Sequence, residues 1–151
     1  MATLQRRLLR DFKKVQSDNG TNYTAIFEEK QITKWDVVLF GPEGSEWDGG
    51  VFRMTITFPD TYPHTVPDVK FVDIPFHPNI YQNGSICLDL LQHNWSSAYD
   101  VSAILTSVQS LLVAPNPHSP ANNEAAVLFC DNKNEYKRRV RASVESTWKN
   151  Q

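Results

Sequence analysis

The sequence has little cysteine, little glycine and no long hydrophobic run. Its 151 residues include only two cysteines, Cys87 and Cys130, which lie far apart and form no Cys-x-x-Cys pair. This excludes the disulfide framework of a small secreted protein and predicts reduced thiols. Six glycines leave no phosphate-binding loop. No stretch approaches the roughly 18 apolar residues of a membrane-spanning helix and no signal-peptide core opens the chain, so we expect a soluble, intracellular protein without a membrane partner.

Positive charge is scarce in the middle of the chain and concentrated at both ends. The formal net charge is -2, yet residues 1–14 carry five basic side chains against one acidic, and residues 131–151 carry six against three. An acidic total disfavours direct binding of nucleic acid. A local basic face could still dock an acidic protein surface, although the C-terminal cluster fits a solvated helix face equally well.

Histidine and cysteine are also too sparse for a metal centre. The four histidines, His64, His77, His93 and His118, stand at least 13 positions apart, and Cys87 and His93 are the only close Cys/His pair. No structural zinc spacing results, so no metal is predicted. A papain-like hydrolase would pair Cys87 with His93 or His118, but neither histidine carries a local signature for that chemistry.

The chain begins with the pattern of an amphipathic helix and continues with that of a sheet. Leu4, Leu8, Phe12 and Val15 recur every three or four residues and predict a helix that ends at Ser17-Asp18-Asn19-Gly20. Four segments with strand character follow, at residues 23–28, 35–40, 51–58 and 69–72. Their connections are too short for crossover helices, which predicts an antiparallel meander.

The helical pattern returns after Asp100, a good N-cap, and ends before Pro115. Two more helices are predicted, at about residues 123–130 and 133–148. Apolar positions in the last one repeat every four residues: Tyr136, Val140, Val144 and Trp148. All nine prolines lie between Pro42 and Pro120, and the five from Pro59 to Pro78 mark an irregular stretch that leads from the sheet into the segment around Cys87. We expect an α+β fold and a single domain over residues 1–151 with no tail.

Chemistry is most plausible in the segment 77–88. Asn83-Gly84 predicts a two-residue turn, which places Ile80 opposite Cys87. Asn79 then lies within roughly 5 to 8 Å of the thiol. Its amide could stabilise an oxyanion at a carbonyl attached to Cys87, an effect worth about 3 kcal/mol. Alternatively, the amide only ties down the proline turn through backbone hydrogen bonds.

The two cysteines are expected in different surroundings. Free cysteines are usually buried and inert. Cys130 follows Ala126 and Phe129 on one helical face and is expected in the core. Cys87 follows a turn in an irregular stretch, where exposure is expected.

Several motifs stand in a specific order around Cys87. They are His77-Pro78-Asn79, Gly84-Ser85-Ile86-Cys87-Leu88-Asp89 and Trp95-Ser96, with Trp35, Phe40-Gly41-Pro42, Tyr62-Pro63 and the run Pro115–Asn122 in support. Together they resemble the signature of the ubiquitin-conjugating enzymes. The resemblance covers essentially residues 1–150 and implies that family's fold: a helix, a four-stranded antiparallel sheet, an irregular active-site stretch and three C-terminal helices. Within the family, the sequence is most similar to the short, tail-less DNA-damage-tolerance (postreplication repair) type.

The resemblance implies a transfer reaction at Cys87. This residue would accept ubiquitin from the activating enzyme as a thioester, and a ubiquitin ligase, expected to be of the RING type, would bring a substrate protein whose lysine attacks it. The activating enzyme consumes the ATP, so no cofactor is implied. Asn79 would stabilise the oxyanion or shape the loop. Tyr81 and Ser119 would desolvate and orient the incoming amine.

The remaining site residues are implied to support the site or to bind partners. Those with a structural role are His77, Pro78 and Asp89. Those that would contact the activating enzyme or the ligase are Arg6, Arg7 and Arg10 on the first helix, His64, and the loop residues Trp95, Ser96, Ser97 and Ala98. The subtype implies a role in DNA repair and a cytoplasmic and nuclear location. The alternatives are a carrier for a ubiquitin-like modifier and a non-catalytic ubiquitin-binding scaffold, although Cys87 in an intact motif argues against the second.

Overall fold

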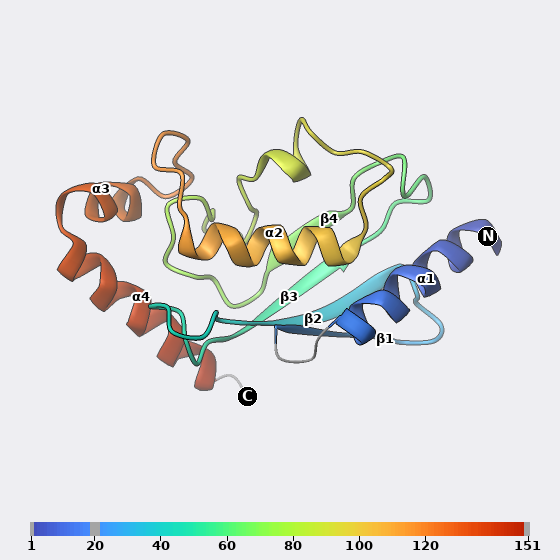
Figure 1. Cartoon of the computed structure of the whole chain (residues 1–151), viewed down its shortest axis with the longest axis horizontal. Coiled ribbons are helices and arrows are strands. Elements are labelled where there is room, and N and C mark those ends of the chain that lie inside the picture. The colour runs from blue at the N-terminus through green and yellow to red at the C-terminus, as the bar shows by residue number, and fades with distance from the viewer. Residues whose placement is uncertain (1, 19–21, 150–151) are drawn as a thin grey trace.

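An amphipathic helix leads into a four-stranded sheet, and three further helices complete the chain (Figure 1). The structure is a computed structural model and describes residues 2–18 and 22–149. Its elements are α1 (Ala2–Asp18), β1 (Tyr23–Phe27), β2 (Lys34–Phe40), β3 (Val51–Thr57), β4 (Asp68–Phe71), the short 3-10 helix η1 (Asp89–Leu91), α2 (Val101–Val113), α3 (Asn123–Asp131) and α4 (Lys133–Trp148). The predicted helix end at Asn19-Gly20 lies outside the described residues.

The sheet is the antiparallel meander that the short connections predict. The strand order is β1-β2-β3-β4, and each strand pairs with the next one antiparallel. On β3, alternate side chains are buried: Phe52, Met54 and Ile56 are at most 1% exposed, whereas Arg53 between them faces solvent. This period of two confirms the strand pattern. One face of the sheet therefore supplies the core.

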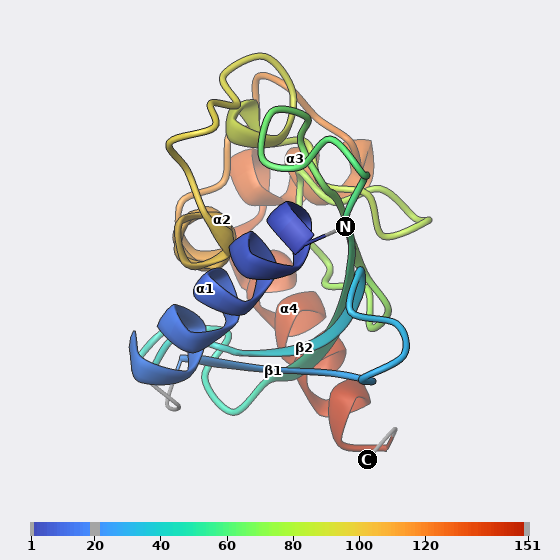
Figure 2. The same ribbon diagram turned by 90° about the vertical axis from the view of Figure 1, so that its right-hand side faces the viewer.

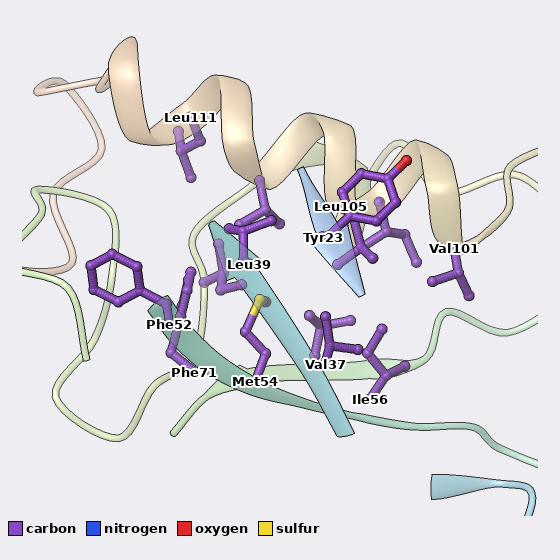
Figure 3. Close-up of a cluster of buried hydrophobic side chains, with 14 of the residues drawn as sticks. Tyr23, Val37, Leu39, Phe52, Met54, Ile56, Phe71, Val101, Leu105 and Leu111 are labelled. Carbon is purple, nitrogen blue, oxygen red and sulfur yellow. The ribbon is translucent and has the colours of Figure 1, made fainter. Parts of the chain in front are cut away.

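Helix α2 covers the apolar face of the sheet. Figure 3 shows Leu105 and Leu111 of α2 pointing toward Leu39 and Met54 of the strands. Asp100 caps the helix as predicted, because its Oδ1 accepts a hydrogen bond from the Ala103 amide over 2.9 Å. Helix α1 lies on the same side of the sheet, beside α2 (Figures 1 and 2). The stretch between β4 and α2, which carries the candidate site, runs along the edge of this core.

The predicted apolar face of α4 is correct except at its last position. Tyr136, Val140 and Val144 are buried, but Trp148 is 49% exposed and Thr147 is buried in its place. Each step of four residues drifts by about 40° on a helix of 3.6 residues per turn. Three such steps lead from Tyr136 to Trp148, which therefore lies about 120° from the starting face. Trp148 instead donates its indole N–H to Gly49 O over 2.8 Å.

Within residues 2–18 and 22–149, no helix combines the length and the apolar character that a bilayer crossing demands.

Candidate active site

The hairpin turn that precedes the candidate cysteine has three residues rather than two. The Tyr81 amide donates to Ser85 O over 2.9 Å, so residues 82–84 form the turn. The Gly84 amide also donates to Tyr81 O over 3.0 Å. The two-residue turn predicted at Asn83-Gly84 is therefore wrong.

The longer turn follows from the backbone conformation of Asn83 and Gly84. A two-residue turn of the predicted type needs a positive φ at both. Here only Gly84 has one, of +90°. A Cβ at Gly84 would lie 2.1 Å from Phe71 O, so no larger residue fits without movement of the backbone. Asn83 instead uses its side chain, because its Oδ1 accepts from the Ser85 amide over 2.9 Å.

The added turn residue moves the pairing by one position. Ile80 pairs with Ile86 instead of Cys87. The Cys87 amide donates to Asn79 O over 2.8 Å. Asn79 is therefore directly opposite the cysteine rather than one position away, which brings the two residues closer than the sequence predicts.

The side-chain amide of Asn79 binds a distant backbone segment. Its Nδ2 donates to Asn116 O over 2.8 Å and to Ser119 O over 3.0 Å. Its Oδ1 accepts from the Asn116 amide over 2.8 Å. Both amide hydrogens are thus engaged by backbone carbonyls, so the side chain holds the segment 116–119 beside residue 79, which lies opposite Cys87. The sequence left two roles open for this amide, stabilisation of an oxyanion and hydrogen bonding to the backbone. In the structure the amide binds the backbone, but that of the segment 116–119 rather than that of its own proline turn.

His77 is a fully buried bridge between the site and α2. Its Nε2 lies 2.7 Å from Leu111 O, and its Nδ1 accepts from the Asn79 amide over 2.9 Å. Because Nδ1 accepts, the ring is neutral and Nε2 carries the proton. Burial lowers the pKa of His77 to about 4, and the hydrogen bonds to the backbone carbonyls of α2 oppose this shift only in part.

Pro78 completes the attachment of the C-terminal segment. Its carbonyl accepts from the amides of Ala121 and Asn122, over 2.7 and 3.0 Å. The backbone from 116 to 122 is therefore fastened to the His77–Asn79 turn at both of its ends. Stretches some 40 positions apart in sequence form one site.

Asn116 is a site residue that sequence reasoning did not single out. Its one sequence signal is its position between Pro115 and Pro117. Proline disfavours helical backbone in the residue before it, and its own nitrogen carries no hydrogen. The backbone amide and carbonyl of Asn116 therefore have no partners in a helix and can bind a side chain.

The two cysteines differ from expectation in their exposure. Cys87 is half-buried and Cys130 is exposed. The prediction of a core position for Cys130 is wrong: α3 buries Ala125 and Ala126 and packs Leu128 and Phe129 partly against the core, whereas Cys130 on its last turn faces solvent. Phe129 packs on Tyr136, with ring centroids 5.2 Å apart, and leaves Cys130 on the outside.

Three other predicted site residues, Tyr81, Asp89 and Ser119, lie on the segments around this arrangement. Tyr81 is 42% exposed at the hairpin turn. Ser119 is exposed; its carbonyl oxygen accepts from Asn79 Nδ2, and its amide donates to Asn116 O over 3.4 Å. Asp89 begins η1, and its carbonyl accepts from the amides of the three residues that end this turn, Gln92, His93 and Asn94.

The three arginines of α1 do not share one environment. Arg6 and Arg10 are exposed. The Arg7 side chain is only 13% exposed, because its Nε donates to Asp11 and its Nη2 donates to Tyr99 O over 2.6 Å. The helix therefore exposes two of the predicted docking arginines to solvent and turns the third inward.

The two predicted ligase-contacting loops meet beside this arginine. Trp95 donates its indole N–H to Pro63 O over 2.8 Å, next to the exposed His64. Within the second loop, Ser96 Oγ accepts from the Ala98 amide over 3.2 Å. Ser97 O lies 3.5 Å from Arg7 Nη1. These residues form one surface at the end of the molecule that carries the start of α1.

Metal ligands are not gathered anywhere in the part of the chain that the structure describes: no three His, Cys, Asp or Glu side chains come together there. The site is thus a half-buried cysteine on an edge, framed by an asparagine, a neutral histidine and a proline-rich segment.

Comparison with known proteins identifies the family to which this chain is similar. The family model described as ubiquitin-conjugating enzyme matches residues 7–144. The chain is 51% identical over 144 residues to "Ubiquitin-conjugating enzyme E2 3" of Arabidopsis thaliana, with 95% of this chain and 96% of that protein covered. It is 49% identical over 146 residues to "Ubiquitin-conjugating enzyme E2 1" of Caenorhabditis elegans, with 97% and 76% covered.

This chain belongs to the ubiquitin-conjugating enzyme family. The helix, four-stranded antiparallel sheet and three C-terminal helices are that family's α+β fold, which confirms the predicted fold class. The family acts as transferases in ubiquitin conjugation, and its members work with ubiquitin, an activating enzyme and a ligase.

Proposed function

We propose that Cys87 carries ubiquitin as a thioester and passes it to a lysine of a substrate protein, with a RING-type ligase as the partner. The observation that carries the assignment is the position of Cys87: it is half-buried and directly opposite Asn79, whose side chain holds the segment 116–119. Cys130, the other thiol, stands on the last turn of α3 with no comparable surroundings.

The proposed reaction has two steps. In the first, the Cys87 thiol loses its proton and Sγ attacks the thioester carbonyl on the activating enzyme; the new C–S bond forms, the old one breaks, and the activating enzyme's cysteine leaves as a thiolate that takes up a proton from solvent. In the second, the lysine nitrogen attacks the carbonyl on Cys87. The C–N bond forms, the C–S bond breaks, the amine loses its proton to solvent and Cys87 regains its thiol.

The hydrogen bonds around the thiol suit storage of a thioester. His77 is occupied at both ring nitrogens and neutral, so it is no general base for water. Asn79 keeps the segment 116–119 in place, and Ser119 on that segment and Tyr81 on the turn are exposed where an incoming lysine would pass. We assign them to the orientation of the amine, and His77, Pro78 and Asp89 to the support of the site.

A charging assay tests the proposal. The protein is incubated with ubiquitin, a ubiquitin-activating enzyme and ATP, and the products are separated with and without reductant. A reductant-sensitive adduct is expected that is lost in Cys87→Ala and kept in Cys130→Ala. Absence of any adduct in the unaltered protein would refute the enzymatic role, and charging only by a ubiquitin-like protein tested in parallel would reassign the modifier.

The same proposal places the activating enzyme on the exposed face of α1. Arg6, Arg10 and Lys13 are exposed and follow at steps of four and three, so they line one side of the helix. Reversal of Arg6 and Arg10 to Glu should raise the KM of charging about tenfold or more, since charge complementarity governs docking. Reversal of Lys30 and Lys34 to Glu, two exposed residues between β1 and the start of β2, changes the net charge by the same amount and should leave the KM unchanged. Equal KM values for both variants contradict the docking face.

A role in DNA-damage tolerance, and a location in both nucleus and cytoplasm, belong to the same proposal. They rest on the similarity of the segments 83–89 and 115–122 to that type. Loss of the gene should sensitise cells to agents that block replication, and a copy with Cys87→Ala should not restore resistance. Unchanged survival of cells without the gene would exclude this role.

A further inference from the structure

Asp11 is a buried carboxylate that the chemistry at Cys87 does not use. It lies on α1 between Leu8 and Val15, on the apolar side of the helix, and is only 1% exposed. Burial of a charge is costly unless it is paired and hydrogen-bonded. Asp11 is both, since Arg7 Nε donates to its Oδ1 over 3.0 Å and the Tyr62 hydroxyl donates to its Oδ2.

These two donors connect α1 to both loops of the proposed ligase-binding face. Tyr62 immediately precedes Pro63 and His64 in the first loop. Arg7 reaches the second loop, with Nη2 at 2.6 Å from Tyr99 O and Nη1 at 3.5 Å from Ser97 O. The Arg7 guanidinium also stacks over the Tyr62 ring, 5.3 Å from its centroid. One carboxylate thus stands where the helix and both loops converge.

Trp95 closes the arrangement by joining the two loops to each other. Its indole N–H donates to Pro63 O over 2.8 Å. Its ring lies 6.0 Å from that of Tyr62 and 5.8 Å from that of Tyr99. The two loops have little regular structure, so their relative position depends on these contacts.

We propose that Asp11 is a positioning residue for ligase-dependent transfer: through Arg7 and Tyr62 it holds the loops 62–64 and 95–99 against α1 in the arrangement that a ligase binds. This rests on the proposed ligase role of the loops. A carboxylate serves here because its two oxygens fix two donors in direction, which apolar packing of the same volume does not do. Burial raises the pKa of Tyr62, and the Asp11 carboxylate raises it further, so the hydroxyl remains a donor at neutral pH.

The geometry is tested by the indole N–H signals in a ¹⁵N-labelled sample. The four tryptophans each donate to a different carbonyl, of Ile32, Leu112, Pro63 and Gly49. In Asp11→Asn, the signal of Trp95, identified with Trp95→Phe, should shift or broaden while the other three stay in place. Tyr62→Phe, which removes one hydroxyl and keeps the ring, should change the same signal less.

The consequence for transfer is tested by discharge of the ubiquitin thioester to free lysine. The rate is measured without a ligase and with increasing amounts of a RING domain, chosen from a panel because it accelerates discharge by the unaltered protein. In Asp11→Asn, the RING concentration at half-maximal acceleration should rise about tenfold, as expected for loss of a charged buried hydrogen bond. The rate without ligase and the rate at saturating RING domain should stay within about twofold.

Lys14→Gln is the matched control on the same helix. Lys14 is exposed and pairs with Asp100 over 2.8 Å, outside the two loops. This variant should change neither the Trp95 signal nor the half-maximal RING concentration. A Trp95 signal unaffected by Asp11→Asn overturns the positioning role. Equal slowing of the reactions with and without RING domain also overturns it, since it would indicate general loss of structure.

A panel in which no RING domain accelerates discharge by the charged, unaltered protein gives a different result. It overturns the ligase assignment in the proposed function, and with it the consequence of Asp11 for transfer. The Trp95 signal then reports separately on whether Asp11 holds the loops, so the two failures are distinguishable.

Discussion

Two hydrogen-bond networks hold irregular segments on this core, and they differ in charge. The active-site network joins residues 77–79 to the segment 116–122 through an amide, a neutral imidazole and backbone groups. The α1 network joins the loops 62–64 and 95–99 to the helix through a buried carboxylate and a guanidinium. Both attach segments without regular secondary structure to helices or strands of the core.

The difference in charge fits the chemistry proposed at each place. A free base or carboxylate beside a stored thioester would activate water against it. The neutral groups at the active site hold the segment without that hazard. At the docking face no bond is made or broken, so an ion pair is tolerated there, and its directional contacts fix the loops. The next experiments ask whether each network acts as this contrast requires.

Removal of Asn79 should have the largest effect. Asn79→Ala deletes the three side-chain hydrogen bonds to Asn116 and Ser119. The segment would then be free to move away from the site, and discharge of the thioester to lysine should slow on the order of 10²-fold, the loss expected when reacting groups are misplaced by about 1 Å. Single-turnover discharge of purified thioester measures it.

Asn116→Ala is the matched control for that change. It also removes an amide from the site, but the groups of Asn116 that bind Asn79 belong to the backbone and remain. Discharge should slow far less in this variant. If both variants discharge at the same rate, the Asn79 side chain does not act by holding the segment.

The fold was largely predictable because hydrophobic periodicity is local. The alternation at Phe52, Met54 and Ile56 and the cap at Asp100 depend on neighbours in sequence, and both are as predicted. Trp148 was misplaced because the four-residue step drifts around a helix. Cys130 was misplaced because the pattern of α3 does not indicate where the core stops.

The site was predictable in its residues but less so in its geometry. Cys87 and Asn79 are neighbours as expected, yet the pairing differs by one position because the turn depends on Gly84 meeting Phe71, a contact with another strand. Arg7 was grouped with the outer arginines, although an acidic residue four positions later on the apolar face, Asp11, is a sequence signal for an inward pair.

His77 provides a test of the neutral network through pH. Its pKa is about 4 in the folded protein against 6.5 as the ordinary value, so the unfolded chain binds a proton between these pH values and the folded protein does not. Stability therefore falls as pH drops from 6.5 to 4, by up to about 3 kcal/mol from this residue. Urea unfolding over this range should show the loss, and His77→Gln, which does not titrate, should lack that part of it.

Parallel stability curves for the two proteins would contradict a neutral buried His77. A loss of stability in His77→Gln at every pH would not by itself contradict it, since the replaced ring leaves some volume unfilled. The pH dependence of the difference between the curves carries the test.

Asp100 combines both kinds of contact in one side chain and should give the smallest effect. Partial burial alone would raise the pKa of Asp100, but hydrogen bonds from Lys14 and the Ala103 amide outweigh it and lower the pKa. Asp100→Ala removes cap and ion pair together and should cost about 1 kcal/mol of unfolding free energy. Asp100→Asn keeps an N-cap acceptor and loses only the pairing with an exposed lysine, which contributes little in water. Its urea midpoint should stay near that of the unaltered protein. Equal destabilisation of Asp100→Asn and Asp100→Ala would contradict this expectation. It would mean that an exposed ion pair contributes as much to stability as a buried one on this fold. The two networks would then differ through their charge rather than through their burial.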